Sequence, residues 1–599
     1  MDQKNLIVAI ALSLAILLGW QFMVEGPKQE ARKAEQQRQA ELAGRSPGSI
    51  GVPNVPAFES GQATAPAAPR ERDEIVRESA RLEIDTPSIR GSINLTGGRF
   101  DDVVLRNYRQ TTEPDSPKIT LLSPRGTANP YFAEFGWLTG NGSVTGGGKT
   151  TWTSDQDKLT NTSPAVLTAR TDDGLLLTRT ISVDERYMFT ITDRVQNTGN
   201  APVNVIPFGR VTRVNTPDTR GFFILHEGPI GVLGEDLHEI DYDDLKDEPS
   251  KPQTFQSTGG WLGFTDTYWL TALVPESNEK VDARFLYDTT SSGADLYQTD
   301  FRGPAVNLAP GESAEDMHRL FAGAKVFEVL KRYQEGPGEG KPGAEELKID
   351  RFELAIDFGW FFFLTKPLLQ VIIYSADHLG NFGLAILLVT VIIKLFFFPL
   401  ANKSYRSMSA MKALQPKMTE LREKYADDKQ KMQQELMAMY KREKVNPVSG
   451  CLPMLIQIPV FFALYKVIFI SIEMRHAPFF GWIQDLSAPD PTTVWNLFGL
   501  IPWDPATIIP AFLMIGVWPL AMGVTMFLQM KLNPAPADPV QAKIFTFMPL
   551  AFTFFLAQFP AGLVIYWTWN NILSMAQQYV IMRRMGVGIG GESTAHTST

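Results

Sequence analysis

Lys394 is the residue whose type and position most strongly suggest a function, because it is the only charged residue in the apolar run Leu384–Pro399. A lysine at the centre of a membrane helix costs roughly 2.5–3.5 kcal/mol on insertion scales, so we expect its amine to face protein or water instead of lipid. Thr390 lies one turn earlier on the same helical face, and the two residues form a polar stripe. The alternative is that the lysine stem snorkels towards the headgroups near Asn402.

Polar side chains recur in two other apolar runs of the C-terminal part. Gln457 interrupts the run 451–472, and the run 566–582 carries several polar residues at helical spacing. Those of the second run are Trp567, Asn570 or Asn571, Ser574, and Gln577 or Gln578. Each one alone is more often a hydrogen-bonding contact between membrane helices. Together with Lys394 they indicate a polar, hydrated cavity inside a helical bundle.

The other side chains with chemical potential do not predict catalysis. The single cysteine, Cys451, excludes an intramolecular disulfide and a metal site built from cysteines. The six histidines show no pair at ligand spacing, and the carboxylates of residues 75–335 are numerous but spread. The run Asp241-Tyr-Asp-Asp reads as a solvated acidic loop, with a calcium loop as the alternative. We therefore predict no catalytic residue, no metal site and no cofactor.

The charges of the chain are distributed very unevenly along its 599 residues. Residues 24–357 hold 36 Lys and Arg against 51 Asp and Glu, whereas residues 402–448 hold 11 against 6. The remaining 218 residues hold only 9 basic and 8 acidic side chains. The overall net charge of −9 therefore averages over an acidic part, a basic part and a nearly uncharged part, which argues against a single soluble globule.

Six apolar runs are long enough to be membrane helices. The first, Leu6–Val24, would be about 28 Å long as a helix, and no small-x-small site follows it before Pro27. We interpret it as a retained anchor instead of a cleaved signal peptide. The other five runs are 382–401, 451–472, 511–530, 544–565 and 566–582. Phe559-Pro-Ala-Gly is expected to form the turn between the last two.

Lysines and arginines beside these runs predict their orientation. The segment 402–448 holds 11 of them, and more lie at the ends of the fourth, fifth and sixth runs on the same side. The loop 473–510, on the opposite side, holds only Arg475. The segment 402–448 and both termini are therefore predicted to be cytoplasmic, and the acidic region 24–357 is predicted to lie outside.

Three segments outside the apolar runs have recognisable patterns. Short alternating runs between turn residues, such as Leu175–Val183, predict an all-β sandwich. The aromatic run Phe358–Tyr374, with Lys366-Pro367 in its middle, is expected to lie along the outer membrane interface. Apolar residues at three- and four-residue steps in Asn402–Asn446 predict an antiparallel helical hairpin. Its six methionines either form the core of the hairpin or offer a surface to hydrophobic clients, and its basic face could attract acidic lipids, RNA or an acidic protein.

The sequence thus predicts a polytopic α-helical membrane protein with six transmembrane helices, a large all-β domain outside and a helical hairpin in the cytoplasm. In chain order the predicted parts are an anchor helix (1–24), a linker (25–74), the β-sandwich (75–340), an interfacial helix (355–376), the second transmembrane helix (380–401), the hairpin (402–448), transmembrane helices three to six (449–585) and a short cytoplasmic tail (586–599).

Three motifs carry a resemblance to a known family. They are Val445-Asn-Pro-Val-Ser-Gly-Cys-Leu-Pro-Met-Leu-Ile-Gln, Phe547-Met-Pro, and Phe559-Pro-Ala-Gly-Leu-Val-Ile-Tyr-Trp. With these motifs and this architecture, the chain resembles the YidC/Oxa/Alb family of membrane protein insertases, in its Gram-negative form with a large periplasmic domain. The motif match is specific over about 355–585 and weak in the outer domain.

The resemblance implies a mechanism. An amphiphilic groove, open to lipid and cytoplasm, would receive the polar part of a nascent membrane protein while the apolar segment slides into lipid. The groove positions map onto Lys394, Thr390, Gln457, Tyr566, Trp567 and Asn570. The family usually has arginine where this chain has Lys394. Lysine is a point charge without a bidentate fork, so we expect attraction for acidic client segments without a fork-shaped contact.

The resemblance also implies a location and partners. The location is the bacterial inner membrane, with the β-sandwich in the periplasm and similar to sugar-binding supersandwiches. The implied partners are nascent membrane proteins, the lipid bilayer, the Sec translocon, and the ribosome and targeting factors reached through the hairpin. No direct DNA binding is expected. The tail, Met585–Thr599, lacks the basic extension that some members use to contact ribosomes.

Two other functions are consistent with some of these features. A polytopic transporter or channel would also use an intramembrane lysine, but it would usually show repeated halves, and the apolar runs show no internal repeat. A carbohydrate enzyme anchored by the bundle would need paired acids converging within residues 75–335, which the sequence does not establish.

Overall fold

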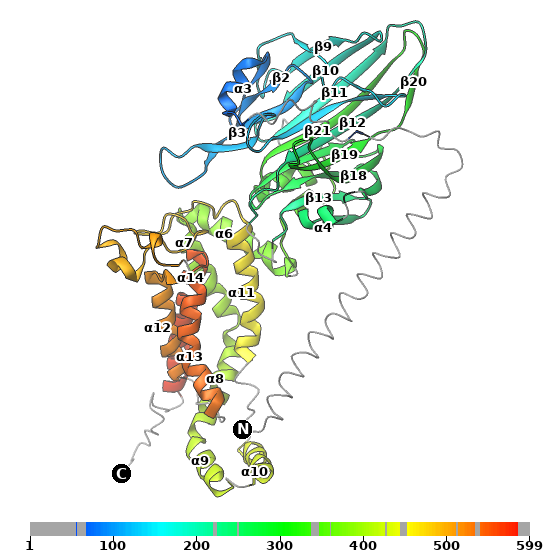
Figure 1. Cartoon of the computed structure of the whole chain (residues 1–599). Coiled ribbons are helices and arrows are strands. Elements are labelled where there is room, and N and C mark those ends of the chain that lie inside the picture. The colour runs from blue at the N-terminus through cyan, green and yellow to red at the C-terminus, as the bar shows by residue number, and fades with distance from the viewer. Residues whose placement is uncertain are drawn as a thin grey trace. The chain divides into compact units, whose positions relative to one another are not determined.

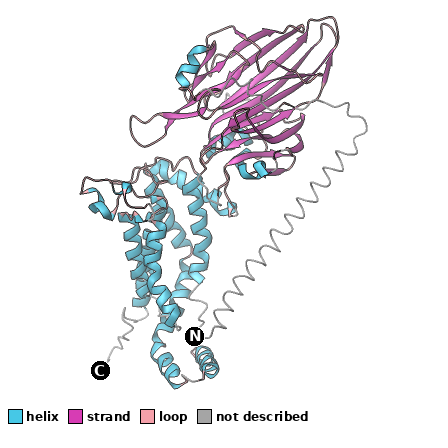
Figure 2. Cartoon of the chain, viewed as in Figure 1, coloured by secondary structure: helices cyan, strands magenta, loops and turns pink. Residues whose placement is uncertain are grey.

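The computed structural model describes residues 55–56, 68–219, 225–247, 249, 251–336, 347–359, 361–425, 428–443, 452–510, 513–532 and 539–584. The predicted anchor Leu6–Val24, most of the linker 25–74 and the tail 586–599 lie outside the described residues. In the described part, strands occupy the first half of the chain and helices occupy the second half (Figure 2).

Residues 81–324 form two β-sheets (Figure 1). The twelve-stranded sheet comprises β1 (Arg81–Asp85), β2 (Ile89–Asn94), β3 (Arg99–Arg109), β4 (Lys118–Leu122), β5 (Tyr131–Thr139), β6 (Val144–Thr145), β8 (Lys158–Leu159), β12 (Val203–Val214), β15 (Gln253–Thr258), β18 (Lys280–Thr289), β19 (Asp295–Arg302) and β20 (Val306–Leu308). The nine-stranded sheet comprises β7 (Thr153–Ser154), β9 (Ala165–Arg170), β10 (Leu175–Val183), β11 (Met188–Asn197), β13 (Gly228–Leu233), β14 (Asp236–Glu239), β16 (Trp261–Thr265), β17 (Trp269–Pro275) and β21 (Ser313–Ala324).

The first sheet has the strand order β15-β18-β19-β12-β5-β3-β2-β1-β8, and the second has the order β14-β13-β16-β17-β21-β11-β10-β9-β7. The alternation in Leu175–Val183 predicts one buried and one exposed face, and β10 shows it, with Leu175, Leu177, Ile181 and Val183 all buried. Side chains from both sheets, Phe135 and Phe189 among them, share one hydrophobic core. The prediction of an all-β sandwich is confirmed.

Short helices accompany the sheets: α3 (Arg72–Glu78), α4 (Tyr242–Asp247), α5 (Phe327–Glu335) and the 3-10 helix η2 (Phe352–Ala355). The acidic run at 241–244, predicted as a loop, is helical from Tyr242 onwards. Its conformation differs from the prediction because Tyr242 and Leu245 lie one turn apart and are both buried, which a helix allows. Asp243 and Asp244 remain exposed.

The second half of the chain is helical. Its helices are α6 (Phe362–Leu379), α7 (Phe382–Phe396), α8 (Phe398–Ala413), α9 (Gln415–Lys424), α10 (Lys429–Arg442), α11 (Leu452–Ile470), η4 (Val494–Gly499), η5 (Pro505–Thr507), α12 (Val517–Leu532), α13 (Pro539–Leu556) and α14 (Ala561–Arg584). Helices α7, α11, α12, α13 and α14 run side by side as a bundle (Figure 1).

The corner between α6 and α7 follows from two residues. Gly380 ends α6 in the left-handed region, with φ of 67°, and its amide donates to the carbonyl of Ala376. Asn381 then caps α7, since its side-chain oxygen accepts a hydrogen bond from the Leu384 amide at 3.0 Å. Glycine and asparagine in succession therefore fix where one helix stops and the next begins.

Two predicted helix boundaries are wrong. The run 382–401 is not one helix, because it bends by 63° at Phe397, between α7 and α8. Pro399 lies in the first turn of α8, where its missing amide removes no helical hydrogen bond. The apolar runs 544–565 and 566–582 place the end of one helix and the start of the next too late, because α13 ends at Leu556 and α14 begins at Ala561. The connection 557–560 contains Phe559 and Pro560 of the predicted turn. The amides of Ala561 and Gly562 donate to the carbonyls of Ala488 and Leu486, which satisfies two orphan groups of that first turn.

Within the described residues, length and apolar composition together single out one candidate membrane span, which is the bent pair Phe382–Phe396 and Phe398–Ser404; no unbroken helix there meets both conditions. The segments Gln457–Ile470 and Lys543–Leu556 are apolar but shorter.

Candidate functional site

A row of polar residues runs along one face of α14. Tyr566, Asn570 and Ser574 follow one another at intervals of four residues, so they lie on the same helical face. All three are buried, with 2%, 8% and 3% of their surface exposed. We call these three residues the α14 polar row. A polar row buried in a bundle needs partners from neighbouring helices or a polar ligand.

Lys394 of α7 contacts the C-terminal end of this row, at Ser574. Its Nζ donates a hydrogen bond to Oγ of Ser574 at 2.8 Å. The Ser574 hydroxyl in turn donates to the carbonyl of Asn570 at 2.7 Å. The amine is therefore directed at protein groups within the bundle, as expected from the cost of exposing it to lipid.

Gln457 of α11 contacts the N-terminal end of the row, at Tyr566. Its Nε2 donates a hydrogen bond to the hydroxyl oxygen of Tyr566. The α14 polar row is therefore in contact with one polar side chain from α7 and one from α11. These contacts bring together Lys394, Gln457, Tyr566 and Asn570, four of the six residues named in the sequence analysis.

Thr390 and Trp567 have other surroundings. The Thr390 hydroxyl donates to the carbonyl of Ile386 at 2.7 Å, so this bond lies within α7 and does not join Lys394. The ring of Trp567 packs edge-on against Phe461 at 4.7 Å and Phe552 at 5.8 Å, which makes it part of an aromatic cluster between α11, α13 and α14.

Two further polar residues of α14, Asn571 and Gln578, connect it to α12. Nδ2 of Asn571 donates to Oγ1 of Thr525 at 3.3 Å, and Nε2 of Gln578 donates to the carbonyl of Leu532 at 3.2 Å. They are contacts between helices, which was the simpler interpretation of each one. The sequence left Asn570 and Asn571 as alternatives, and the helix places only Asn570 in the row.

Asn570 has an unused acceptor. Its side-chain oxygen is buried and has no hydrogen-bond partner among the described residues. An unsatisfied buried carbonyl oxygen costs about 1–3 kcal/mol. This oxygen is therefore ready to accept a hydrogen bond from a donor that enters the site.

The second lysine of the apolar runs has a partner that the sequence did not reveal. Nζ of Lys466 lies 2.6 Å from Oδ2 of Asp357 and 3.2 Å from the carbonyl of the same residue. The charge of Lys466 is therefore compensated inside the protein by the Asp357 carboxylate. The only signal available was that Asp357 is the last acidic residue before the aromatic run that becomes α6.

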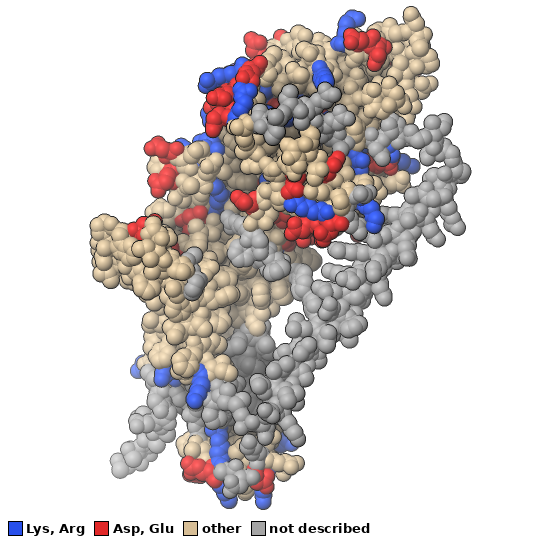
Figure 3. Space-filling model, viewed as in Figure 1, with Lys and Arg blue, Asp and Glu red and all other residues tan. Residues whose placement is uncertain are grey.

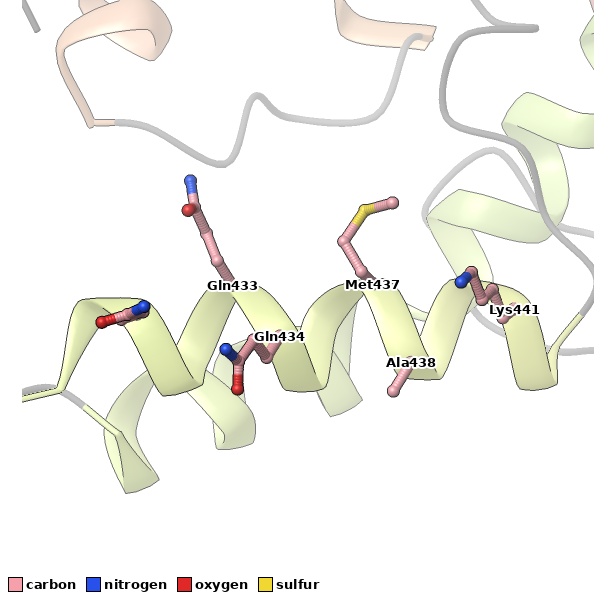
Figure 4. Close-up of a pocket in the computed structure, with 6 residues that line it drawn as sticks. Gln433, Gln434, Met437, Ala438 and Lys441 are labelled. Carbon is pink, nitrogen blue, oxygen red and sulfur yellow. The ribbon is translucent and has the colours of Figure 1, made fainter.

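The sequence left open whether the methionines of this segment are buried in a core or exposed on a surface. Helices α9 and α10 contain methionines of both kinds. Met418 and Met439 are buried, with 6% and 1% exposed, and the Tyr440 hydroxyl lies 3.7 Å from the Met418 sulfur. Met437 is 52% exposed. It lines a shallow hollow of about 520 Å³ along α10, and its side chain points to the same side as that of Gln433 (Figure 4). The other lining residues are Gln430, Gln434, Ala438 and Lys441.

Charged side chains are frequent on some elements of the chain and rare on others. On the face shown in Figure 3, acidic and basic residues gather over the sheets and again over α9 and α10. The surface of the bundle is almost free of charge on that face. Within α7, Lys394 is the only charged residue.

Comparisons with known proteins cover almost the whole chain. Residues 374–587 match the family described as 60Kd inner membrane protein, and residues 81–371 match the family described as YidC periplasmic domain. A protein of Methylorubrum extorquens named membrane protein insertase YidC is 51% identical over 98% of this chain and 96% of its own length. A protein of the same name from Beijerinckia indica subsp. indica is also 51% identical, over 98% and 97%. A solved structure described as an active YidC insertase with its first transmembrane domain resolved is 17% identical, with a TM-score of 0.33 and coverage of 84% of this chain and 92% of that one.

Proposed function

The chain belongs to the YidC family of membrane protein insertases, and we propose that it inserts membrane proteins by receiving their polar segments at the α14 polar row and Lys394. The observation that carries this proposal is the contact between Lys394 and Ser574, which holds a cation inside an apolar bundle. Gln457, Tyr566 and Asn570 extend the same polar surface. Thr390 and Trp567 act as its supports, through the packing of α7 and of the aromatic cluster.

Insertion requires that polar groups of the client cross hydrocarbon. Each unpaired polar group would otherwise cost several kcal/mol. Lys394 offers a charge-assisted hydrogen bond to an acidic client segment, and the free Asn570 oxygen offers an acceptor to a backbone amide. The driving force is the burial of the client's apolar segment in lipid, so the process needs neither covalent chemistry nor a cofactor.

We propose that the chain crosses the bacterial inner membrane six times, with both termini and the segment 402–448 in the cytoplasm. The support is the count of lysines and arginines, 11 in 402–448 against one in 473–510. The β-sandwich then lies in the periplasm, which agrees with the family that residues 81–371 match. The division into parts from 1–24 to 586–599 given above belongs to the same proposal.

The partners belong to the proposal as well. Nascent membrane proteins are the clients, and the bilayer is the medium into which they leave. We propose that α9 and α10 form the predicted hairpin and that it contacts the ribosome and targeting factors, because these helices combine basic residues with the exposed Met437. The Sec translocon is a further proposed partner, with which clients would be shared. The comparisons give no support to a transporter or channel.

Site-specific photocrosslinking to arrested nascent chains tests the proposal. A photoreactive residue at Lys394 or Asn570 should form adducts with an acidic segment of the client. The matched control position is Thr568, which is also on α14 and 4% exposed, but whose hydroxyl bonds to the Val564 carbonyl within the helix. Adducts at Thr568 as abundant as at Asn570, or client adducts at neither Lys394 nor Asn570, would contradict the proposed path.

A further inference from the structure

One face of the twelve-stranded sheet carries charged side chains that are nevertheless buried. In strand β5, Phe135 points into the core of the sandwich and Glu134 points to the opposite face. Glu134, Arg210, Gln298 and Asp300 have exposures of 0%, 4%, 1% and 2%. Buried charges need partners, so the groups that cover this face must be polar or paired.

Three ion pairs organise this face, and one of them joins Nη2 of Arg99 to Oε1 of Glu134 at 3.3 Å. Arg210 of β12 donates to Glu134, with 3.0 Å between Nε and Oε2. Arg284 of β18 donates to Asp300 of β19, with 2.9 Å between Nη2 and Oδ2. The guanidinium groups of Arg210 and Arg284 each have more donors than one carboxylate uses.

The other donors bind two consecutive carbonyl groups of the N-terminal linker. Nη1 of Arg210 donates to the carbonyl of Pro56 at 3.0 Å, and Nη2 of Arg284 donates to the carbonyl of Val55. Nε2 of Gln298 lies 3.4 Å from the Pro56 carbonyl as well. These contacts join residues that are 154, 229 and 242 positions apart in the chain.

The Val55 side chain occupies an apolar pocket on the same face. It is 2% exposed and packs with Leu138, Ile206 and Phe208, with Val144 at the edge. The pocket lies on β5 and β12, the two strands that also carry Glu134 and Arg210. One apolar side chain and two carbonyl groups are therefore recognised together.

The chemistry of the site suits a segment in which proline follows an apolar residue. The groups that meet the two carbonyls are all donors. Proline has a carbonyl group that can accept these hydrogen bonds. It has no backbone amide, so no amide donor would be left without a partner on this face. Proline also biases the preceding residue towards the extended conformation, which separates successive carbonyls for recognition by different side chains.

We propose that this face of the twelve-stranded sheet is a binding site for an extended peptide, and that its occupant is the chain's own linker, latched at Val55-Pro56. The latch divides the linker 25–74 and lets only residues 25–54 span the distance between the predicted anchor and the sandwich. It thereby limits how far the sandwich can move from the anchor. The inference is independent of the insertase activity.

A disulfide test asks whether the latch exists in the full-length protein in membranes. The background is Cys451→Ser, which removes the single native thiol. Oxidation of the pair Val55→Cys and Leu138→Cys should give an intramolecular disulfide, seen as a mobility shift that reductant reverses. The control pair joins Val55→Cys to Thr168→Cys, on an exposed position of β9 in the other sheet. Equal yields for both pairs, or no disulfide between positions 55 and 138, would overturn the latch.

A competition test asks what the site binds. The probe is a fluorescein-labelled peptide with the sequence of residues 51–60, and the readout is fluorescence anisotropy with the full-length protein in nanodiscs. The Val55→Asp variant should bind the probe at least about tenfold more tightly than the unmodified protein, because burying the carboxylate would expel the linker and vacate the site. A probe with the same Val→Asp change should not bind.

Changes in the sheet complete the test. Arg284→Gln in the Val55→Asp background should abolish binding of the probe, and Gln298→Ala should weaken it, with near-UV circular dichroism reporting that each variant is folded. Equal affinities of the unmodified protein and Val55→Asp would overturn the linker as occupant. Absence of binding to Val55→Asp, or binding that survives both sheet variants, would overturn the peptide site.

Discussion

The amine of Lys394 lies 2.8 Å from the hydroxyl oxygen of Ser574, and these two residues are 180 positions apart in the chain. Among the described residues, Lys394 forms its hydrogen bond with a neutral hydroxyl, and no carboxylate pairs with it. A neutral partner orients the cation without neutralising it. The proposed contact with an acidic client segment requires such a charge, because an internal salt bridge would compete for it.

Removing this charge should impair insertion. Lys394→Ala should lower the insertion of a client with an acidic translocated segment roughly tenfold, which corresponds to the loss of about 1.5 kcal/mol from one charge-assisted hydrogen bond. Lys394→Arg should retain most of the activity because it keeps the charge. The measurement is protease protection of the client in proteoliposomes made with each purified variant.

The control for this prediction is Lys531→Ala, which removes a lysine from the end of α12. It should leave insertion unchanged. Equal activity of Lys394→Ala and the unmodified protein on the acidic client would show that the groove charge is dispensable.

The pair formed by Gln457 and Tyr566 should contribute to the stability of the bundle. Tyr566→Phe removes the acceptor of the Gln457 amide, and leaving that buried donor unsatisfied should cost about 1–2 kcal/mol. The double change Gln457→Leu and Tyr566→Phe should cost less than Tyr566→Phe alone, because it removes both partners. Thermal unfolding of the full chain in detergent measures the difference. Tyr579→Phe, at a residue that is 44% exposed, is the matched control and should have no effect.

Much of the fold followed from local patterns, whereas the pairing of distant residues did not. The alternation in Leu175–Val183 specifies a strand, because its period decides which side chains are buried. The same reasoning does not predict which face of α14 turns towards the other helices. Asn570 and Asn571 are about 100° apart around the helix, and only packing decides which of them lies beside Ser574. Lys466 and Asp357 are 109 positions apart, so their contact depends on how α11 packs against the segment before α6.

That contact leads to a further stability prediction. Lys466→Met should destabilise the full chain by about 1–3 kcal/mol, because it leaves the Asp357 carboxylate without its cation. The amide of Gly359 still donates to this carboxylate at 2.9 Å, which keeps the loss below that of a fully stranded charge. Lys466→Met combined with Asp357→Asn should recover part of the loss. Detergent unfolding followed by tryptophan fluorescence measures both, and equal midpoints for the single and double variants would contradict the pairing.

The β-sandwich contains a carboxyl group that should make its stability depend on pH. Burial, followed by the nearby charges of Asp316 and Glu276, raises the pKa of Glu279 from 4.5 to about 8. One of its oxygens is buried without a hydrogen-bond partner among the described residues. The folded state therefore retains a proton that the unfolded chain releases. The stability that this group contributes is complete below pH 4.5 and is lost as the pH rises towards 8.

Glu279→Gln should remove this pH dependence, because the amide keeps a donor next to Asp316 and cannot ionise. At pH 8 the variant should be more stable than the unmodified protein by about 1–2 kcal/mol, a figure reduced from the full shift because the side chain is partly exposed. At pH 4.5 the two proteins should unfold together. The measurement is the urea midpoint of the full chain by near-UV circular dichroism at both pH values, with Glu315→Gln, an exposed neighbour of Asp316, as the control. A stabilisation by Glu279→Gln that is as large at pH 4.5 as at pH 8 would mean that packing, and not the proton, accounts for it.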